Sequence, residues 1–260
     1  LPILADIPLA KNLDLKRDER AVVVRENYND VIEEGFRDLR TNIGFVLKPE
    51  EKVIMLTSCI PCEGKTFVAS NLAMSLALLG KKVIVVGCDL RKPRLVALFG
   101  LKPTNQGIVN FLCTSEPDYG LMDSQIIPSG VHKNMDVLPA GIIPPNPAEL
   151  LSGALLEEAI AYLSSKYDYV ILDTPPVGLV SDTLSIGRLA NLTIFVTRTD
   201  FTPKANFDLI NSISESGKLP KCNIVINGVD FNKRRYAQQY GHYGHYRHYS
   251  SYGNKEKKKH

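Results

Sequence analysis

One segment, residues 57–66 with the sequence TSCIPCEGKT, constrains the fold of this chain more than any other. A short apolar run, Val53 to Leu56, precedes it and has the pattern of a buried strand. A helical pattern, Lys65 to Leu79, follows it and ends at Gly80. A Gly-Lys-Thr sequence at the start of a helix is the end of a nucleotide phosphate loop, whose backbone N–H groups bind phosphate oxygens. The sequence therefore predicts a strand, a phosphate loop and a helix in succession.

The residue types in this loop suit phosphate chemistry. Gly64 allows a close backbone approach, Lys65 can neutralise the β and γ phosphates, and the Thr66 hydroxyl can ligate magnesium. The standard pattern has a glycine where Cys59 stands, and Ser58 starts the turn instead, which lengthens the loop by one residue. A chance Gly-Lys-Thr is the alternative interpretation. We expect nucleotide contacts from eight residues of the loop and the start of the helix: Ser58, Pro61, Cys62, Glu63, Gly64, Lys65, Thr66 and Phe67.

The cysteines give a weaker signal. The chain has five, an odd and scattered number, which argues against a disulfide framework and for a reducing compartment. Cys59 and Cys62 form a Cys-x-x-Cys pair in the loop, but zinc would need two further ligands and none are spaced for it. A redox pair is possible because a helix N-terminus lowers a thiol pKa. Two small side chains in a tight loop are the simpler interpretation.

Apolar runs and helical patterns alternate along the rest of the chain. Strands are expected at 83–86, 135–138, 169–172, 193–197 and 223–226, and helices at 29–47, 108–112, 147–165, 182–189 and 203–216. Continuous β-branched runs between helices indicate a parallel sheet buried on both faces. The prediction is a doubly wound α/β fold with a mostly parallel sheet and helices on both faces. No apolar run reaches the roughly 18 residues that a membrane span requires.

Two aspartates follow strand patterns. Asp89 comes shortly after the strand at 83–86. Asp173 directly follows the strand at 169–172 and precedes Thr-Pro-Pro. Ligands bind at the carboxyl ends of parallel strands, so both acids should face Lys65 and hold a metal ion. A simple turn-forming role for Asp173 is the alternative. Arg91, close behind Asp89, could hold phosphate charge or lie on a solvated helix face.

The C-terminal segment differs in composition from the rest. Residues 232–260 carry a net charge of +7, whereas the remaining body carries −4, which suggests an interaction segment and not a nucleic-acid-binding fold. No aliphatic residue follows Ala237, so a folded element is not expected. Metal binding by the histidines and stacking of the rings on RNA or sugar are alternatives. A flexible segment of this kind can reach a neighbouring subunit, and it holds six of the chain's eleven tyrosines: Tyr236, Tyr240, Tyr243, Tyr246, Tyr249 and Tyr252.

Taken together, these features resemble the bacterial protein-tyrosine kinases of polysaccharide co-polymerase systems. The resemblance covers nearly the whole chain. It rests on the order of the long phosphate loop, an Asp-x-Arg strand end at Asp89, the Asp-Thr-Pro-Pro at Asp173 and the tyrosine-rich tail. It also includes the Glu34-x-x-Arg37-x-x-Arg40 pattern and the two stretches 138–141 and 144–147.

The resemblance implies a deviant phosphate-loop ATPase fold of the partitioning type that binds ATP and Mg²⁺ and phosphorylates its tail tyrosines in trans. It implies catalytic roles for Lys65, Asp89, Asp173 and Arg91, and metal ligation by Thr66, Asp89 and Asp173. Glu34, Arg37 and Arg40 would form contacts in a ring of subunits. Asn227, at the end of the last strand, is a candidate adenine contact.

The resemblance also implies a location and partners. Residues 1–28 would be a juxtamembrane lead-in, 29–231 the kinase domain and 232–260 the flexible tail, at the cytoplasmic face of the inner membrane. A membrane adaptor, fused or separate, and a cognate tyrosine phosphatase would be its partners, with no nucleic acid. The activity would regulate the assembly and export of capsular polysaccharide or exopolysaccharide.

Two departures from the family pattern bear on mechanism. The family has Asp-x-Asp-x-Arg after the second strand, and its first aspartate is thought to take the tyrosine proton, but Gly87 stands there. Asp89 or Asp173 would then be the base. Arg94 stands where some members carry a regulatory tyrosine, which predicts no internal gate. The alternative functions are a partitioning-type ATPase switch, although residues 57–62 lack the lysine that such proteins often carry there, and a non-catalytic nucleotide-binding scaffold.

Overall fold

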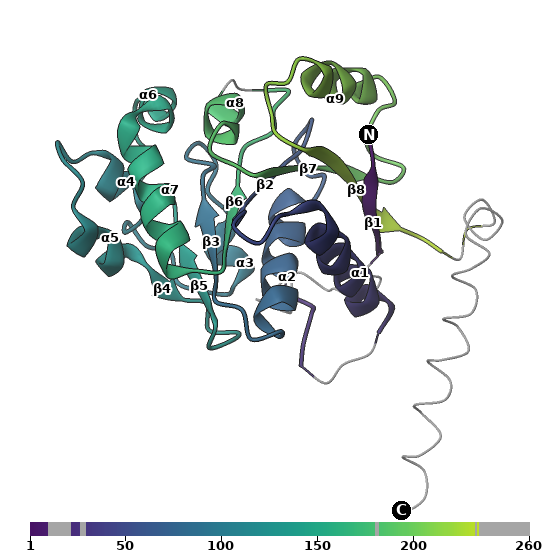
Figure 1. Cartoon of the computed structure of the whole chain (residues 1–260), viewed down its shortest axis with the longest axis horizontal. Helices are drawn as coiled ribbons and strands as arrows, with labels where there is room; N and C mark the ends of the chain where they lie inside the picture. The colour runs from purple at the N-terminus through teal and green to yellow at the C-terminus, as the bar shows by residue number, and fades with distance from the viewer. Residues whose placement is uncertain (10–21, 27–29, 180–181, 232, 234–260) are drawn as a thin grey trace, which may run out of the picture.

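The computed structural model describes residues 1–9, 22–26, 30–179, 182–231 and 233 of the 260-residue chain. Within these residues, one eight-stranded sheet has the order β1-β8-β7-β2-β6-β3-β5-β4 (Figure 1). All neighbouring strands are parallel except the pair β4 and β5. The strands are β1 (Ile3–Pro8), β2 (Val53–Thr57), β3 (Val83–Gly87), β4 (Ile127–Pro128), β5 (Met135–Leu138), β6 (Tyr169–Asp173), β7 (Leu192–Arg198) and β8 (Cys222–Val229).

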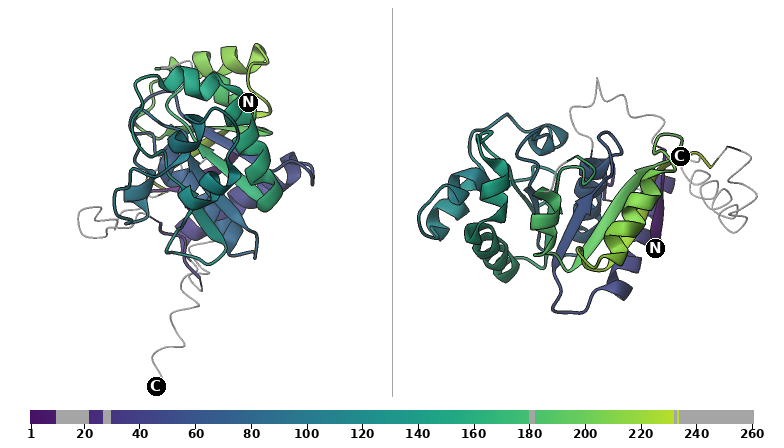
Figure 2. Two further views of the ribbon diagram at one scale, coloured as in Figure 1. Left: turned by 90° about the vertical axis from the view of Figure 1, so that its left-hand side faces the viewer. Right: turned by 90° about the horizontal axis from the view of Figure 1, so that it is seen from above.

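Helices cover both faces of this sheet (Figure 2). One apolar cluster contains buried residues of the first three helices, α1 (Val31–Val46), α2 (Lys65–Ala77) and α3 (Leu95–Leu98). The other cluster contains buried residues of the later helices in the described part of the chain: α4 (Ile108–Leu112), α5 (Tyr119–Gln125), α6 (Pro147–Ser152), α7 (Ala154–Lys166), α8 (Asp182–Gly187) and α9 (Asn206–Glu215). The doubly wound fold predicted from the sequence is therefore confirmed.

The sheet topology brings the predicted site residues together at the carboxyl ends of neighbouring strands. β2 is buried along its whole length and lies between β6 and β7. In the strand register, Leu56 of β2 and Gly87 of β3 both lie beside Asp173 of β6. The phosphate loop, Asp173 and the residues after Gly87 therefore start from neighbouring strand ends, as expected for a ligand site in a parallel sheet.

The first strand corrects the predicted division of the chain. Residues 1–28 were interpreted as a lead-in outside the kinase domain, but β1 pairs in parallel with β8 at the edge of the sheet. Leu4 and Ile7 are buried in the same apolar cluster as α1. Residues 3–8 are therefore part of the folded domain. The sequence did not indicate this strand, because Asp6 interrupts its apolar residues and Pro8 ends them.

Other differences are local. The helix expected over 147–165 is two helices, because Gly153 between them has an extended conformation with φ −73° and ψ 160°. Helix α3 and strand β4 were not predicted because they have only four and two residues. Helix α5 was not predicted because its sequence, YGLMDSQ, has few apolar residues at helical spacing. The segment 232–260 lies outside the described residues apart from Lys233. No helix of the described part of the chain is both long and apolar enough to cross a membrane.

Candidate functional site

The centre of the site is the side chain of Lys65 at the start of α2. Its Nζ lies 3.4 Å from Oδ2 of Asp89 and 3.7 Å from Oδ1 of Asp173. The three side chains are between 4% and 14% exposed, so the charges face one another with little water between them. One cation between two carboxylates is the arrangement that the sequence predicted for a phosphate and metal site.

Asp173 is held by a second loop residue. The Thr66 hydroxyl donates to its Oδ1 at 3.1 Å. Burial raises the pKa of the Asp173 carboxyl, and the charge of Lys65 and the Thr66 hydrogen bond partly offset that rise. Asp89 is more open on one side, where its Oδ1 accepts the backbone N–H of Lys92 at 3.0 Å. The two predicted metal carboxylates thus have different surroundings.

The loop conformation depends on Gly64 and on a contact from β8, which is separated from β2 by β7. Gly64 has φ +96°, and a β-carbon there would lie 2.2 Å from Nδ2 of Asn227. That amide donates to the Glu63 carbonyl at 2.9 Å, so the end of β8 holds the phosphate loop. The predicted adenine contact of Asn227 stays a prediction, and the structure adds this loop contact to it.

The Glu63 side chain stabilises the loop from inside. Its carboxylate is fully buried, accepts the Ile60 N–H at 2.9 Å and is hydrogen-bonded to the Thr202 hydroxyl. Burial raises its pKa despite these hydrogen bonds. The Ser58 hydroxyl donates to the Ile60 carbonyl at 2.9 Å. Two residues predicted to contact nucleotide therefore use their side chains to shape the loop, which leaves the loop's backbone for a ligand.

The two loop cysteines have opposite surroundings. Cys62 is exposed and adopts φ +69°, a conformation that favours glycine, and its carbonyl accepts from Arg198 at 3.2 Å. Cys59 is buried, and burial together with the charge of Glu63 raises its thiol pKa to about 12. Both are free thiols. A Cys59 thiol with a raised pKa is a poor nucleophile, which favours the interpretation of two small side chains in a tight loop.

Arg91 contacts a residue that the sequence analysis did not single out. Its guanidinium donates to both carboxylate oxygens of Asp182, at 2.8 and 3.3 Å. Asp182 is buried and begins α8, which follows the Asp-Thr-Pro-Pro segment. The structure therefore shows a bridge between the loop that carries Asp89 and the start of α8. A direct catalytic role for Arg91 stays a prediction.

The predicted subunit-contact residues lie on α1. Arg37 pairs with Glu33 at 3.1 Å and with Glu34 at 2.8 Å on the same helix. Arg40 turns inward and donates to the carbonyl and hydroxyl of Ser75 on α2, at 2.9 and 3.1 Å. Arg40 thus joins two helices of one chain. The six predicted phosphorylation sites lie outside the described residues.

The chain is similar to known proteins over most of its length. Residues 51–213 match the family model described as AAA domain. The chain is 34% identical to the tyrosine-protein kinase YwqD of Bacillus subtilis over 86% of its own length and 93% of that protein. It is 33% identical to the tyrosine-protein kinase wzc of Salmonella typhimurium over 83% of its length, but spans only 29% of that longer protein.

A solved structure, the kinase domain of the Escherichia coli tyrosine kinase ETK, is similar with a TM-score of 0.77. It is 29% identical to this chain, and the match covers 88% of this chain and 91% of that domain. The fold and most of the sequence are therefore shared with proteins described as tyrosine kinases.

Proposed function

Because the chain belongs to the bacterial tyrosine-protein kinase family, we propose that it transfers the γ-phosphoryl group of ATP to tyrosines in the C-terminal segment of a neighbouring copy. The observation that carries the proposal is the position of Lys65 between Asp89 and Asp173 at the end of the phosphate loop. This arrangement can neutralise a phosphoryl group and keep a carboxylate within reach of its acceptor.

The residues fit magnesium and a triphosphate. The Thr66 hydroxyl and the carboxylates of Asp173 and Asp89 are oxygen donors, which Mg²⁺ prefers, and Lys65 lies against both carboxylates. We propose that Thr66, Asp173 and Asp89 would hold the ion. When bound, Mg²⁺ would neutralise charge on the phosphate oxygens.

The chain's own residues then have distinct tasks. The loop backbone binds the phosphates, and Lys65 stabilises the negative charge that develops during transfer. The tyrosine oxygen forms a bond to the γ phosphorus as the bond to the ADP oxygen breaks. We assign the tyrosine proton to Asp89, since Asp173 is tied to Thr66 and more deeply buried. A loose transition state needs little help from a base, which is consistent with Gly87 in place of a carboxylate.

Mass spectrometry of the purified chain after incubation with ATP and Mg²⁺ tests this proposal. We expect phosphate on several of the six tail tyrosines, and none on a control chain in which all six are changed to phenylalanine. Loss of ATP without phosphotyrosine would support the partitioning-type ATPase instead. Neither ATP loss nor phosphotyrosine would support a nucleotide-binding scaffold.

The wider setting is part of the same proposal. We propose that the domain works at the cytoplasmic face of the inner membrane with an adaptor, fused or separate. A tyrosine phosphatase would remove the phosphates that the domain adds. Its phosphorylation state would regulate assembly and export of capsular polysaccharide or exopolysaccharide. Each phosphate adds about −1.5 to −2 charges. Modification of all six tyrosines would add roughly −9 to −12 charges, which would reverse the +7 charge of the tail and weaken its attraction to the acidic body.

We further propose that α1 forms a contact between subunits in a ring. Arg37→Ala is expected to shift the sedimenting mass toward the monomer, because the helix surface of Glu34 and Arg37 would lose its cation. Arg188→Ala is the control, since the Arg188 side chain is also accessible to solvent and paired with a glutamate. An unchanged mass for Arg37→Ala would exclude the α1 contact.

Arg40→Ala is expected to lower the free energy of unfolding by about 1–3 kcal/mol, through its lost hydrogen bonds to Ser75.

A further inference from the structure

The amino ends of the parallel strands form an edge of the sheet that is rich in lysine. We call it the basic edge, and it consists of the turns and helix ends that lead into β2, β3, β5, β6 and β8, at residues 47–52, 79–82, 132–134, 166–168 and 216–221. It contains three acids, Glu50, Glu51 and Asp168, and eight lysines: Lys48, Lys52, Lys81, Lys82, Lys133, Lys166, Lys218 and Lys221. The net charge of these segments is +5, whereas the body as a whole carries −4. The positive charge of the body is therefore concentrated at the basic edge.

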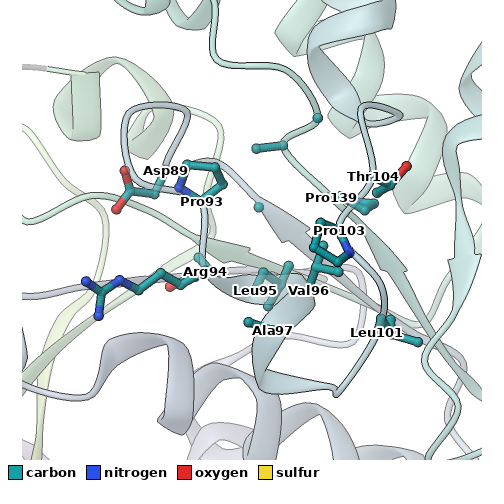
Figure 3. Close-up of a pocket in the computed structure, with 14 residues that line it drawn as sticks. Asp89, Pro93, Arg94, Leu95, Val96, Ala97, Leu101, Pro103, Thr104 and Pro139 are labelled. Carbon is teal, nitrogen blue, oxygen red and sulfur yellow. The ribbon is translucent and has the colours of Figure 1, made fainter. Parts of the chain in front are cut away.

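The site lies at the opposite edge of the sheet. Asp89 and Asp173 line a cleft there, beyond the carboxyl ends of β3 and β6 (Figure 3). Strand β8 is parallel to its neighbours and ends at the same edge, at Val229. A partner bound at the basic edge would therefore leave both the site and the end of β8 uncovered.

Several lysines of the basic edge are available to a partner. Lys166 and Lys221 are paired with acids, and Lys52 donates to the Ser164 carbonyl at 2.8 Å. Four other lysines are exposed and form no ion pair with another residue that the structure describes: Lys81, Lys82, Lys133 and Lys218. Their charges are not neutralised within this part of the chain, so they can attract an anionic partner.

Hydrogen bonds between the turns fix the shape of the basic edge. The Lys82 N–H donates to the Asp168 carboxylate at 2.8 Å, and the Lys82 carbonyl accepts the Asp168 N–H at 2.8 Å. The Val83 N–H donates to the Asn134 carbonyl at 2.9 Å, which joins the turns before β3 and β5. Because neighbouring strands are about 4.8 Å apart, the edge extends for about 25 Å from β8 to β5. The lysines thus lie on one broad surface.

Two large apolar side chains are exposed at this edge. Phe45, in the last turn of α1, is 85% exposed, and Leu79, just after α2, is 57% exposed. Both helices end at the basic edge, because each leads through a short turn into the next strand. Lys221 donates to the Val46 carbonyl at 3.0 Å, which holds the end of α1 beside the turn before β8. A partner for this edge must therefore accept apolar side chains as well as positive charge.

An anionic lipid bilayer offers both. Its headgroups attract lysines, and the boundary between headgroups and hydrocarbon accepts aromatic and aliphatic side chains. We propose that the basic edge binds the surface of an anionic bilayer, with Phe45 and Leu79 at the headgroup boundary and the site facing away from the lipid. This inference rests on the proposed position of the domain at the membrane, adds the surface that contacts the lipid, and does not depend on phosphoryl transfer.

The residue types favour lipid over nucleic acid or a phosphorylated peptide. All eight cations of the basic edge are lysines. Arginine is the residue that recognises discrete phosphates by paired hydrogen bonds, whereas lysine acts as a point charge that suits a diffuse anionic surface. Nucleic acid also lacks an apolar layer into which Phe45 and Leu79 could insert.

Binding to vesicles tests the charges. The full chain is titrated with vesicles of phosphatidylcholine alone and with vesicles of phosphatidylcholine and phosphatidylglycerol in equal amounts. Lys81→Gln combined with Lys82→Gln should weaken binding to the anionic vesicles about tenfold or more, because each lysine near such a surface contributes a factor of about five. Lys92→Gln combined with Lys204→Gln is the control, since it removes the same charge from two exposed lysines after β3 and β7, at the opposite edge. This control should bind within about twofold of the unmodified chain, because its substitutions lie more than a Debye length from the lipid.

Three results of the titration would overturn the inference. Equal weakening by the two pairs of substitutions would show attraction by total charge alone. Binding that neither pair changes would assign the lipid contact to the basic tail. Binding of duplex DNA that depends on Lys81 and Lys82, without binding of vesicles, would assign the edge to nucleic acid. Phosphotyrosine measured on the same chains without vesicles decides the kinase function separately, since neither result depends on the other.

A second measurement follows the apolar contact and leaves the core unchanged. The chain has no tryptophan, so Phe45→Trp introduces a single fluorescent reporter. Its emission should move to shorter wavelength when anionic vesicles are added, as the ring enters the headgroup boundary. Ile143→Trp is the control, because Ile143 is exposed in the loop after β5 at the opposite edge, and its emission should not move.

An equal shift at the two positions, or no shift for Phe45→Trp, would overturn the inference. Emission of Phe45→Trp that is already at short wavelength without vesicles would place this residue in a contact between copies of the chain, and would overturn it as well.

Discussion

Lys65→Met is expected to lower the rate of tyrosine phosphorylation by about 10²–10³-fold while the fold is retained. Methionine keeps much of the length of lysine but removes the charge that lies 3.4 Å from Asp89 and 3.7 Å from Asp173. No other side chain of residues 57–66 carries a positive charge, so the variant loop would not neutralise the negative charge of the transferring group. Phosphotyrosine per chain, measured over time with ATP and Mg²⁺, gives the rate.

The control for this change is Lys81→Met. Lys81 is exposed in the turn before β3, so the same substitution should leave the rate unchanged. Both variants should still unfold cooperatively, because Lys65 begins α2 and is not part of either apolar cluster. A Lys65→Met chain that phosphorylates tyrosine at the unmodified rate would contradict the site described above.

Asp173→Asn is expected to reduce phosphorylation to a similar extent by weakening the magnesium site. The amide keeps an oxygen that can accept from Thr66, but it lacks the charge that attracts a divalent ion. A titration with Mg²⁺ at saturating ATP should therefore need at least about tenfold more metal for half-maximal rate. The exposed Asp208 of α9 provides the control, and Asp208→Asn should leave the titration unchanged.

The stability of the Asp173→Asn chain separates a metal ligand from a structural carboxylate. Burial raises the pKa of Asp173, so its ionised form opposes folding at pH values above that pKa, and asparagine removes this cost. The lost pairing with Lys65 acts in the opposite direction. We expect the free energy of unfolding to change by no more than about 2 kcal/mol. A large loss of stability would show that the effect on activity is structural.

The convergence of Lys65, Thr66, Asp89 and Asp173 was predictable from the sequence. Each residue lies at or just after the carboxyl end of a strand or at the start of the following helix, and these ends meet at one edge of a parallel sheet. The apolar runs and helical patterns in the sequence are enough to locate these strand ends and helix starts.

Contacts between distant parts of the chain were not predictable in the same way. The Asn227 contact to the phosphate loop, the Arg91–Asp182 bridge and the Arg40 contact to Ser75 join residues 164, 91 and 35 positions apart. Helical spacing identified Arg40 as part of a surface pattern but could not show that its guanidinium turns toward α2. The break at Gly153 was missed because apolar residues continue at helical spacing on both sides of it.

The central claim is that the site of one copy phosphorylates the tail of another, and a mixture of two complementary variants tests it most directly. The Lys65→Met chain keeps its tail tyrosines but lacks an active site. The chain with all six tail tyrosines changed to phenylalanine keeps the site but lacks acceptors. With ATP and Mg²⁺, we expect phosphate on the tail of the Lys65→Met chain in the mixture and on neither chain alone. An unphosphorylated Lys65→Met tail in the mixture, under conditions in which the unmodified chain phosphorylates itself, would contradict transfer between copies.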